Sequence, residues 1–256
     1  MKRPGVNICF FFLLLLLSAV HGQEEAAAKG IDSEKLKFHL NYLRMNVATL
    51  EFQFEKRTPE KKAVALTIEA QSSRAVNSLF YVNNRYELIL NEANFLPRFV
   101  RKTINQKNVD YLRIQRFDHQ QGKVAVDDTF QYDVPEPCYD YFSMLYFLRF
   151  GVADTSSMVN FYLDGEFVIS HVKAVFSRDT REIEVSGGKF TATEVKLEFS
   201  SYRKEKRPWK TDLLTNRLTK SGSEVLIFLS ADARRLPLKI IYRNSWTRTT
   251  MELVDY

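Results

Sequence analysis

One long apolar stretch, Pro135 to Phe150, constrains the fold of this 256-residue chain more than any other segment. Two prolines end what precedes it, and Asp140 can then cap a helix by accepting from the free N–H groups of its first turn. At about 100° per residue, the apolar side chains surround most of a helix. One face carries Tyr141, Met144, Leu145 and Leu148, and the remaining arc carries Phe142, Phe147 and Phe150. The pattern predicts a buried helix laid against a sheet.

Blocks of alternating apolar and polar residues lie on both sides of this stretch. Residues 50–55 read Leu-Glu-Phe-Gln-Phe-Glu, the period of a half-buried strand. Asp164-Gly165 and Gly187-Gly188 each separate two apolar runs, as tight hairpin turns do. The apolar positions change parity at Leu43 and again at Leu50, which predicts a bulge or bend. Helices and strands do not alternate, so we expect residues 36–256 to form a single, mainly β domain of antiparallel strands with one short central helix packed on it.

The first 22 residues have the pattern of a secretion signal. Lys2 and Arg3 precede an apolar run from Ile8 to Val20, and a plausible cleavage site stands before Gln23. The run is shorter than the roughly 20 apolar residues of an uncleaved membrane anchor, and no cysteine follows it for lipid attachment. We expect residues 1–22 to be a cleaved signal peptide of an exported protein and residues 23–35, polar and alanine-rich, to be a flexible tether.

Charge and cysteine content limit the partners of the mature chain. The 37 basic and 31 acidic residues give a net charge of +6, and without Lys2 and Arg3 the balance of 35 against 31 is +4. This modest charge gives no reason to expect a nucleic-acid partner. Cys9 lies in the signal segment, so Cys138 has no partner for an intramolecular disulfide. Its setting is typical of a small buried apolar residue, because a reactive thiol needs a positive neighbour.

Three stretches of the chain resemble a known family. They are Asp140-x-x-Ser143-x-x-Tyr146-x-x-Arg149, then Leu229-Ser230-x-Asp232-x-x-Arg235-x-Pro237, and the ordered set of residues 35–52, Phe117-Asp118 and Gly188-Lys189-Phe190. In this order they are similar to the bacterial exported proteins of domain-of-unknown-function family 3108. The resemblance implies an antiparallel β-protein of the Gram-negative periplasm, with a curved open sheet, half-barrel or sandwich like those of periplasmic lipid carriers. The early pair departs from the family, which usually has a glycine near Asn46 and Ala48.

The residues of the helix motif step three positions at a time, so Asp140 and Arg149 point to opposite sides. That spacing is poor for a catalytic group. We expect Asp140 to cap the helix, Ser143 and Tyr146 to bond neighbouring backbone, and Arg149 to pair with a sheet carboxylate, because a buried guanidinium needs a partner. The alternative is ligand contact from this helix, through Phe142, Tyr146, Phe147 and Arg149.

Two further groups of residues have a structural and a functional interpretation. Ser230, Asp232, Arg235 and Pro237 are expected to form a turn in which Asp232 bonds its own backbone. A basic cluster is expected to be a solvated surface loop, with contact to anionic lipid headgroups, lipopolysaccharide or an acidic partner as the alternative. Its members are Arg203, Lys204, Lys206, Arg207, Trp209 and Lys210.

No motif in the sequence predicts catalysis. His39, His119 and His171 lack the spacing of metal ligands, and the chain has no phosphate-binding glycine loop, G-x-S-x-G or H-E-x-x-H. We expect no metal, no cofactor and no enzymatic activity. The 20 Phe and 12 Tyr, with a helix across a curved sheet, favour an apolar cavity. The leading hypothesis is a carrier of an apolar ligand such as a lipid; the second is a module that binds an envelope protein or polysaccharide through its sheet edges, and the third is an envelope hydrolase.

Overall fold

The computed structural model describes residues 31–57, 62–79, 81–152, 158–165, 167–204, 212, 214–215, 223–244 and 248–256. These residues form one sheet of fifteen strands around a short helical segment. The strands are β1 (Ser33–Tyr42), β2 (Met45–Lys56), β3 (Ala63–Ser72), β4 (Asn83–Asn91), β5 (Pro97–Gln106), β6 (Val109–Asp118), β7 (Lys123–Val126), β8 (Phe130–Asp133), β9 (Cys138–Tyr139), β10 (Met158–Asp164), β11 (Val168–Val185), β12 (Gly188–Lys204), β13 (Glu224–Ser230), β14 (Pro237–Arg243) and β15 (Arg248–Asp255).

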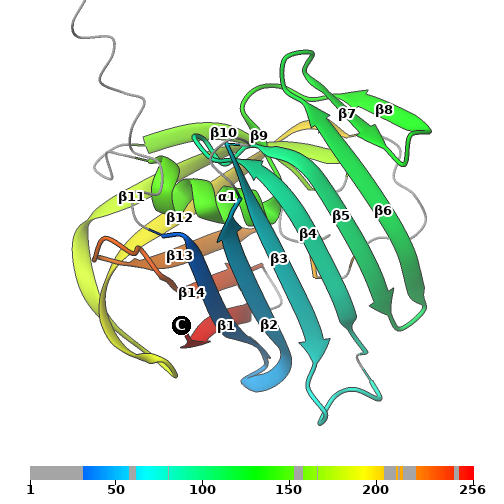
Figure 1. The fold of residues 1–256 in the computed structure, drawn as a ribbon. Helices are drawn as coiled ribbons and strands as arrows, with labels where there is room; N and C mark the ends of the chain where they lie inside the picture. Colours follow the sequence, from blue (N-terminus) through cyan, green and yellow to red (C-terminus); the bar gives the residue numbers. More distant parts are fainter. Residues whose placement is uncertain are drawn as a thin grey trace, which may run out of the picture.

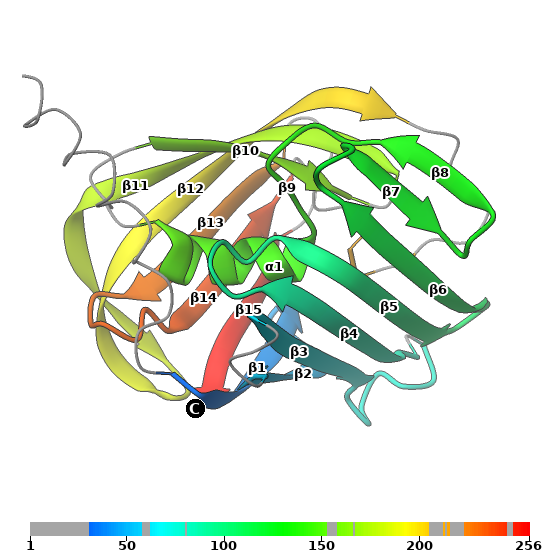
Figure 2. The ribbon, with the colours of Figure 1, turned by 45° about the horizontal axis from the view of Figure 1, so that its top comes forward.

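The strands form two antiparallel runs that meet in the middle of the sheet. Their order is β8-β7-β6-β5-β4-β3-β2-β1-β15-β14-β13-β12-β11-β10-β9, so the pairing of β1 with β15 joins the two runs. Neighbouring strands are antiparallel except β9 and β10, which are parallel. The sheet curves around the helix, and β8 and β9 form its two edges (Figures 1 and 2). The predicted fold, mainly β with a curved open sheet and one short central helix, is confirmed.

The alternating sequence decides which side chains face the concave side. Along β2, Leu50, Phe52 and Phe54 are buried and the acidic and amide residues between them are exposed. The buried rings meet the helix directly: Phe54 stacks on Tyr146 at 5.0 Å between ring centroids, and Phe52 lies edge-on to Phe142 at 5.8 Å. Each such buried side chain contributes about 1.5–3 kcal/mol of hydrophobic stabilisation. The core therefore lies between the concave face and the helix.

A hairpin turn explains the change of parity at Leu43. Strand β1 ends at Tyr42, Leu43 and Arg44 turn the chain with φ values of 48° and 65°, and β2 begins at Met45. The expected bulge or bend is thus mainly a turn, with one register shift between β1 and β2 two residues before Tyr42. Strand β1 also begins at Ser33, so the expected tether is corrected at its end: residues 33–35 belong to the sheet.

Both predicted glycine hairpins are present in the second run. Asp164-Gly165 leads from β10 into β11, where the Gly165 N–H donates to the Val168 carbonyl at 2.9 Å. Gly187-Gly188 joins β11 to β12, and Gly188 has a φ of 135°, which a residue with a side chain rarely adopts.

The central helix lies where the sequence predicted it. Helix α1 (Tyr141–Tyr146) continues as a wider π turn, η2 (Phe147–Gly151). Asp140 accepts from the N–H groups of Phe142 at 2.7 Å and Ser143 at 3.2 Å, and Ser143 Oγ accepts from the Asp140 N–H at 3.0 Å. This reciprocal pair is a capping box, which satisfies N–H groups that have no partner within the helix. The helix begins immediately after Asp140, as expected.

Candidate functional site

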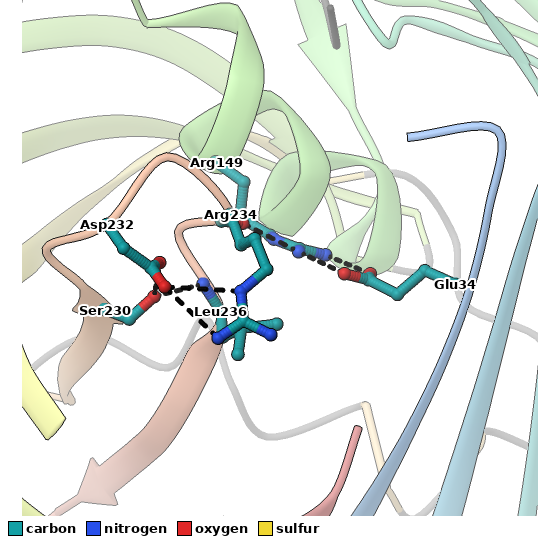
Figure 3. Close-up of polar contacts among 6 residues, drawn as sticks. All are labelled: Glu34, Arg149, Ser230, Asp232, Arg234 and Leu236. Atoms are coloured by element: carbon teal, nitrogen blue, oxygen red, sulfur yellow. Dashed lines mark hydrogen bonds and ion pairs between the residues drawn. The ribbon is translucent and has the colours of Figure 1, made fainter. Parts of the chain in front are cut away.

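Arg149 fastens the helix to two distant parts of the sheet (Figure 3). Its side chain is fully buried, and its guanidinium binds Glu34 of β1 through two parallel contacts of 2.7 and 2.8 Å. Nε donates to the Arg235 carbonyl and Nη2 to the Arg234 carbonyl, both at 3.0 Å. The expected sheet carboxylate is therefore Glu34, at a position that the sequence had placed in the tether. A buried charge with this many partners is a structural clamp.

The second motif forms the other half of this clamp. In the turn between β13 and β14, Ser230 Oγ donates to Asp232 at 2.6 Å and accepts from the Leu236 N–H at 2.8 Å (Figure 3). Pro237 then begins β14. The Arg235 guanidinium donates to the Val152 carbonyl at 2.9 Å, just beyond η2. The helix and this turn thus each bind the other's backbone, and burial together with nearby Arg149 lowers the pKa of Arg235 to about 10.

Tyr146 completes the placement of the helix motif. Its ring packs parallel to Phe54, and burial raises the pKa of its hydroxyl. Burial also raises the pKa of the Asp140 carboxyl, against the opposing effect of the N–H donors of the cap. All four motif residues are buried. Ser143 Oγ bonds the Asp140 backbone as expected, but the backbone bond expected of Tyr146 is wrong, because its buried hydroxyl has no hydrogen-bond partner among the described residues and its ring serves in packing.

A cavity of about 590 Å³ lies between the concave face and α1. Its volume is in the range of pockets that bind small molecules. The lining side chains are almost all aliphatic or aromatic, and they come from α1, from β1 and β2, from the β3–β4 connection and from β12 to β15. They include Leu40, Met45, Val47, Leu50, Phe52, Val76, Leu79, Tyr141, Phe142, Met144, Leu145, Leu197, Phe199, Val225, Ile227, Ile240 and Met251. Such a lining favours apolar groups, because it offers few hydrogen-bond partners.

The four side chains proposed as ligand contacts divide between the cavity and the core. Phe142 lines the cavity, and its ring also contacts Tyr86 at 4.8 Å. Tyr146 faces Phe54, Phe147 stacks on Tyr139 at 4.5 Å, and Arg149 lies in the clamp. These three are outside the lining, since the helix turns them toward other parts of the core.

A buried polar cluster centred on Asp212 borders the cavity. Asp212 accepts from Tyr86 Oη at 2.6 Å, Gln106 Nε2 at 2.7 Å, the Leu214 N–H at 2.9 Å and Thr215 Oγ1 at 3.0 Å. Leu214 and Thr215 in turn line the cavity. Sequence reasoning missed this cluster because Tyr86 and Gln106 are more than 100 positions from Asp212. The alternation of Asn84 and Tyr86 along β4 was the signal that polar groups point inward there.

A second buried carboxylate links strands at the two edges of the sheet. Asp164 of β10 accepts from the Tyr132 hydroxyl of β8, from Gln115 Nε2 of β6 at 3.0 Å and from the Phe167 N–H at 3.1 Å. Burial raises the pKa of Asp164, and its donors oppose that shift. Cys138 is a free, buried cysteine close to it, and burial with the neighbouring carboxylates raises the pKa of the thiol. That environment keeps the thiol protonated, which disfavours nucleophilic chemistry.

The predicted basic loop is in part a strand. Arg203 and Lys204 are the last residues of β12, and Arg203 binds Asp133 at the end of β8 at 3.3 Å. Both residues pair with β11, Arg203 with Ile169 and Lys204 with Val168, so their assignment to a loop was wrong. Lys206, Arg207, Trp209 and Lys210 lie outside the described residues.

The three histidines lie on separate strands or turns. His39 is in β1, His119 Nε2 lies 2.7 Å from the Pro97 carbonyl, and the His171 ring packs against Tyr162. None of the three lines the cavity. Among the residues that the structure describes, no three His, Cys, Asp or Glu side chains are grouped to hold a metal ion. Within the same residues, no helix has the length and hydropathy needed to cross a membrane.

Comparison with solved structures supports the architecture. The chain is similar to a beta-barrel-like protein of domain of unknown function DUF1849 from Brucella abortus, with a TM-score of 0.54 and 8% sequence identity. The match covers 88% of this chain and 97% of the other. At this identity the likeness concerns the fold alone. No curated protein matches the sequence.

Comparison with protein families agrees with the three motifs. The family model described as "Protein of unknown function (DUF3108)" matches residues 37–254, which include β1 from residue 37 onward, the capped helix and the β13–β14 turn. The match extends over most of the chain, so it includes both halves of the Arg149 clamp except Glu34 itself. The chain therefore belongs to the DUF3108 family.

Proposed function

We propose that this protein binds an apolar molecule, such as an acyl chain of a lipid, in the cavity between α1 and the concave face, and that it does so without catalysis. The observation that carries the proposal is the cavity itself, about 590 Å³ with a nearly continuous apolar lining. The alternative of a module that acts through its sheet edges predicted a filled interior, so the cavity favours the carrier. A hydrolase would need histidine and carboxylates to converge at the cavity, and the described residues that line it include neither.

The proposal includes export to the periplasm of a Gram-negative bacterium. It rests on the signal-like residues 1–22 and on the family resemblance, and the ligand would then be an apolar component of the cell envelope. An envelope protein or an anionic membrane surface would be the partner that supplies or receives it.

Native mass spectrometry on the chain exported from a bacterial host tests the proposal. We expect a bound mass that solvent extraction removes, or uptake of an added fatty acid by the extracted protein. Ile240→Trp places a large side chain in the cavity and should reduce binding at least tenfold. Ile89→Trp is the matched control, because Ile89 is equally half-buried and is not part of the lining. A wild-type protein that neither carries nor takes up an aliphatic ligand would show the proposal to be wrong.

A further inference from the structure

The cavity opens at one end of the sheet, between the β1–β2 turn and the connection from β3 to β4. The lining residues that are exposed to solvent identify this opening: Tyr42 is 37% exposed, Met45 54% and Leu79 78%. The two segments are fastened together, because Ser73 bonds the backbone of Asn46 and Val47 at 2.7 and 2.9 Å. Both lie at the lower end of the sheet in Figure 1. We call residues 42–45 and 74–79 the mouth rim.

The mouth rim is apolar on a part of the surface where water would favour polar residues. Leu43 stands at the tip of the turn and is 66% exposed, next to exposed Met45 and Tyr42. A contiguous group of large exposed apolar side chains on a soluble fold marks a surface that contacts a membrane or another molecule. This group continues directly into the cavity, so whatever contacts the rim also contacts the opening.

The turn itself uses residues that are costly for its geometry. A two-residue turn with positive φ at both positions normally carries Asn-Gly, because other side chains are strained there. Leu43 and Arg44 adopt 48° and 65° instead. Backbone strain of this kind is retained where the side chains serve a purpose beyond folding. Here the two side chains presented at the tip are one apolar and one cationic.

Positive charge surrounds the apolar tip. Arg44, Arg74 and Arg248 are exposed at this end, and none of them forms an ion pair with the described residues. Residues 42–48, 73–79 and 248–251 contain no Asp or Glu, and Glu224 on a neighbouring strand is bound to Arg243 at 3.5 Å. Exposed apolar side chains beside arginines that form no ion pair with the described residues complement a bilayer whose surface is anionic and whose interior is apolar.

We propose that the mouth rim docks on an anionic lipid bilayer, with Leu43 and Leu79 inserted among the lipids and Arg44, Arg74 and Arg248 at the headgroups. This inference rests on the proposed function, since it makes the rim the entrance through which an apolar chain passes between bilayer and cavity. It differs from contact through the basic cluster, because Arg203 and Lys204 pair with Ile169 and Val168 of β11 and are not part of the rim, and Lys206, Arg207, Trp209 and Lys210 lie outside the described residues.

Sedimentation with vesicles of phosphatidylcholine, with and without phosphatidylglycerol, tests the inference. We expect binding that requires phosphatidylglycerol and weakens at high salt. The double change Leu43→Asp with Leu79→Asp should weaken it at least tenfold, and Arg44→Glu with Arg74→Glu by about fivefold or more per arginine. Leu43→Asp suits the turn, because Asp tolerates positive φ. Leu112→Asp and Arg178→Glu make the same kinds of change at exposed residues outside the rim and should bind as wild type does.

Uptake of a soluble fluorescent fatty acid, measured without vesicles, separates this inference from the proposed function. Rim variants that load the fatty acid normally but no longer bind vesicles would support docking. Rim variants that bind vesicles as wild type does, or controls that lose binding equally, would overturn the docking inference alone. Failure of the wild-type protein to load the fatty acid would instead overturn the carrier proposal.

Discussion

At the scale of single residues, Arg149 has the largest predicted effect on stability. Its guanidinium is fully buried, and replacing it with Met would leave the Glu34 carboxylate without its bidentate partner and two carbonyls without donors. Removing one member of a buried ion pair costs about 3–5 kcal/mol. We therefore expect Arg149→Met to lower the free energy of unfolding by about that amount, measured by urea denaturation.

The control for this prediction is an exposed arginine in an ion pair. Arg85 binds Glu69 on the outer face of β4, where solvent screens the interaction, so Arg85→Met should cost at most about 1 kcal/mol. Adding Glu34→Gln to Arg149→Met should recover part of the loss, because the buried charge is removed. Equal losses for the Arg149 and Arg85 variants would contradict the clamp.

At the scale of elements, the β13–β14 turn depends on one hydroxyl. Ser230 Oγ is the partner of both Asp232 and the buried Leu236 N–H, so Ser230→Ala would leave that N–H unpaired. An unsatisfied buried donor costs about 1–3 kcal/mol. We expect this loss in urea denaturation, whereas Ser177→Ala, which removes an exposed local hydroxyl contact, should change stability by less than about 0.5 kcal/mol. Ser230→Ala stability equal to wild type would show that the turn does not need the hydroxyl.

The elements also show which parts of the structure local sequence can predict. The cap at Asp140 and the hairpins at Gly165 and Gly188 depend on residues within a few positions, and the sequence predicted them. The carboxylate for Arg149 was expected, but its identity was not, because Glu34 lies 115 positions away in a segment without a clear pattern. The strand at Arg203 was missed because a run of charges is more typical of a loop.

In the candidate site, too, features set by nearby residues were predictable and those set by distant strand pairing were not. The sequence predicted an apolar cavity beside the helix from aromatic content, and of four proposed contacts only Phe142 lines it. Which face of a short helix meets a cavity depends on where the curved sheet closes around it, and that depends on the pairing of β1 with β15, near the opposite ends of the chain. Periodicity within one segment carries no information about such pairings.

At the scale of the whole molecule, side-chain contacts link the two edges of an open sheet. Strand β8 is not paired with β9 or β10, yet the Tyr132 hydroxyl and Gln115 reach across to the Asp164 carboxylate, and Arg203 binds Asp133 nearby. The closure therefore depends on a buried, titratable group rather than on backbone hydrogen bonds. Its strength should change with pH.

The direction of that change follows from the pKa of Asp164. Burial raises this pKa in the folded protein above the ordinary aspartate value of 3.8, so the folded state binds more protons than the unfolded state between the two values. Lowering the pH through that window stabilises the folded state. Asp164→Asn cannot titrate, so the stability of wild type relative to this variant should increase as the pH falls from 7 towards 4.

Urea denaturation of both proteins across this pH range measures the difference, and titrating groups common to both cancel. Asp110→Asn removes an exposed carboxyl with the same change of charge and is the matched control. The quantity of interest is the free energy of unfolding of wild type minus that of Asp164→Asn. If it stays constant or decreases as the pH falls, the two edges of the sheet are not held through an ionisable Asp164. If it increases as the pH falls, the contact between the two edges of the sheet depends on the Asp164 carboxyl group, because no backbone pairing joins β8 to β10 in the described residues.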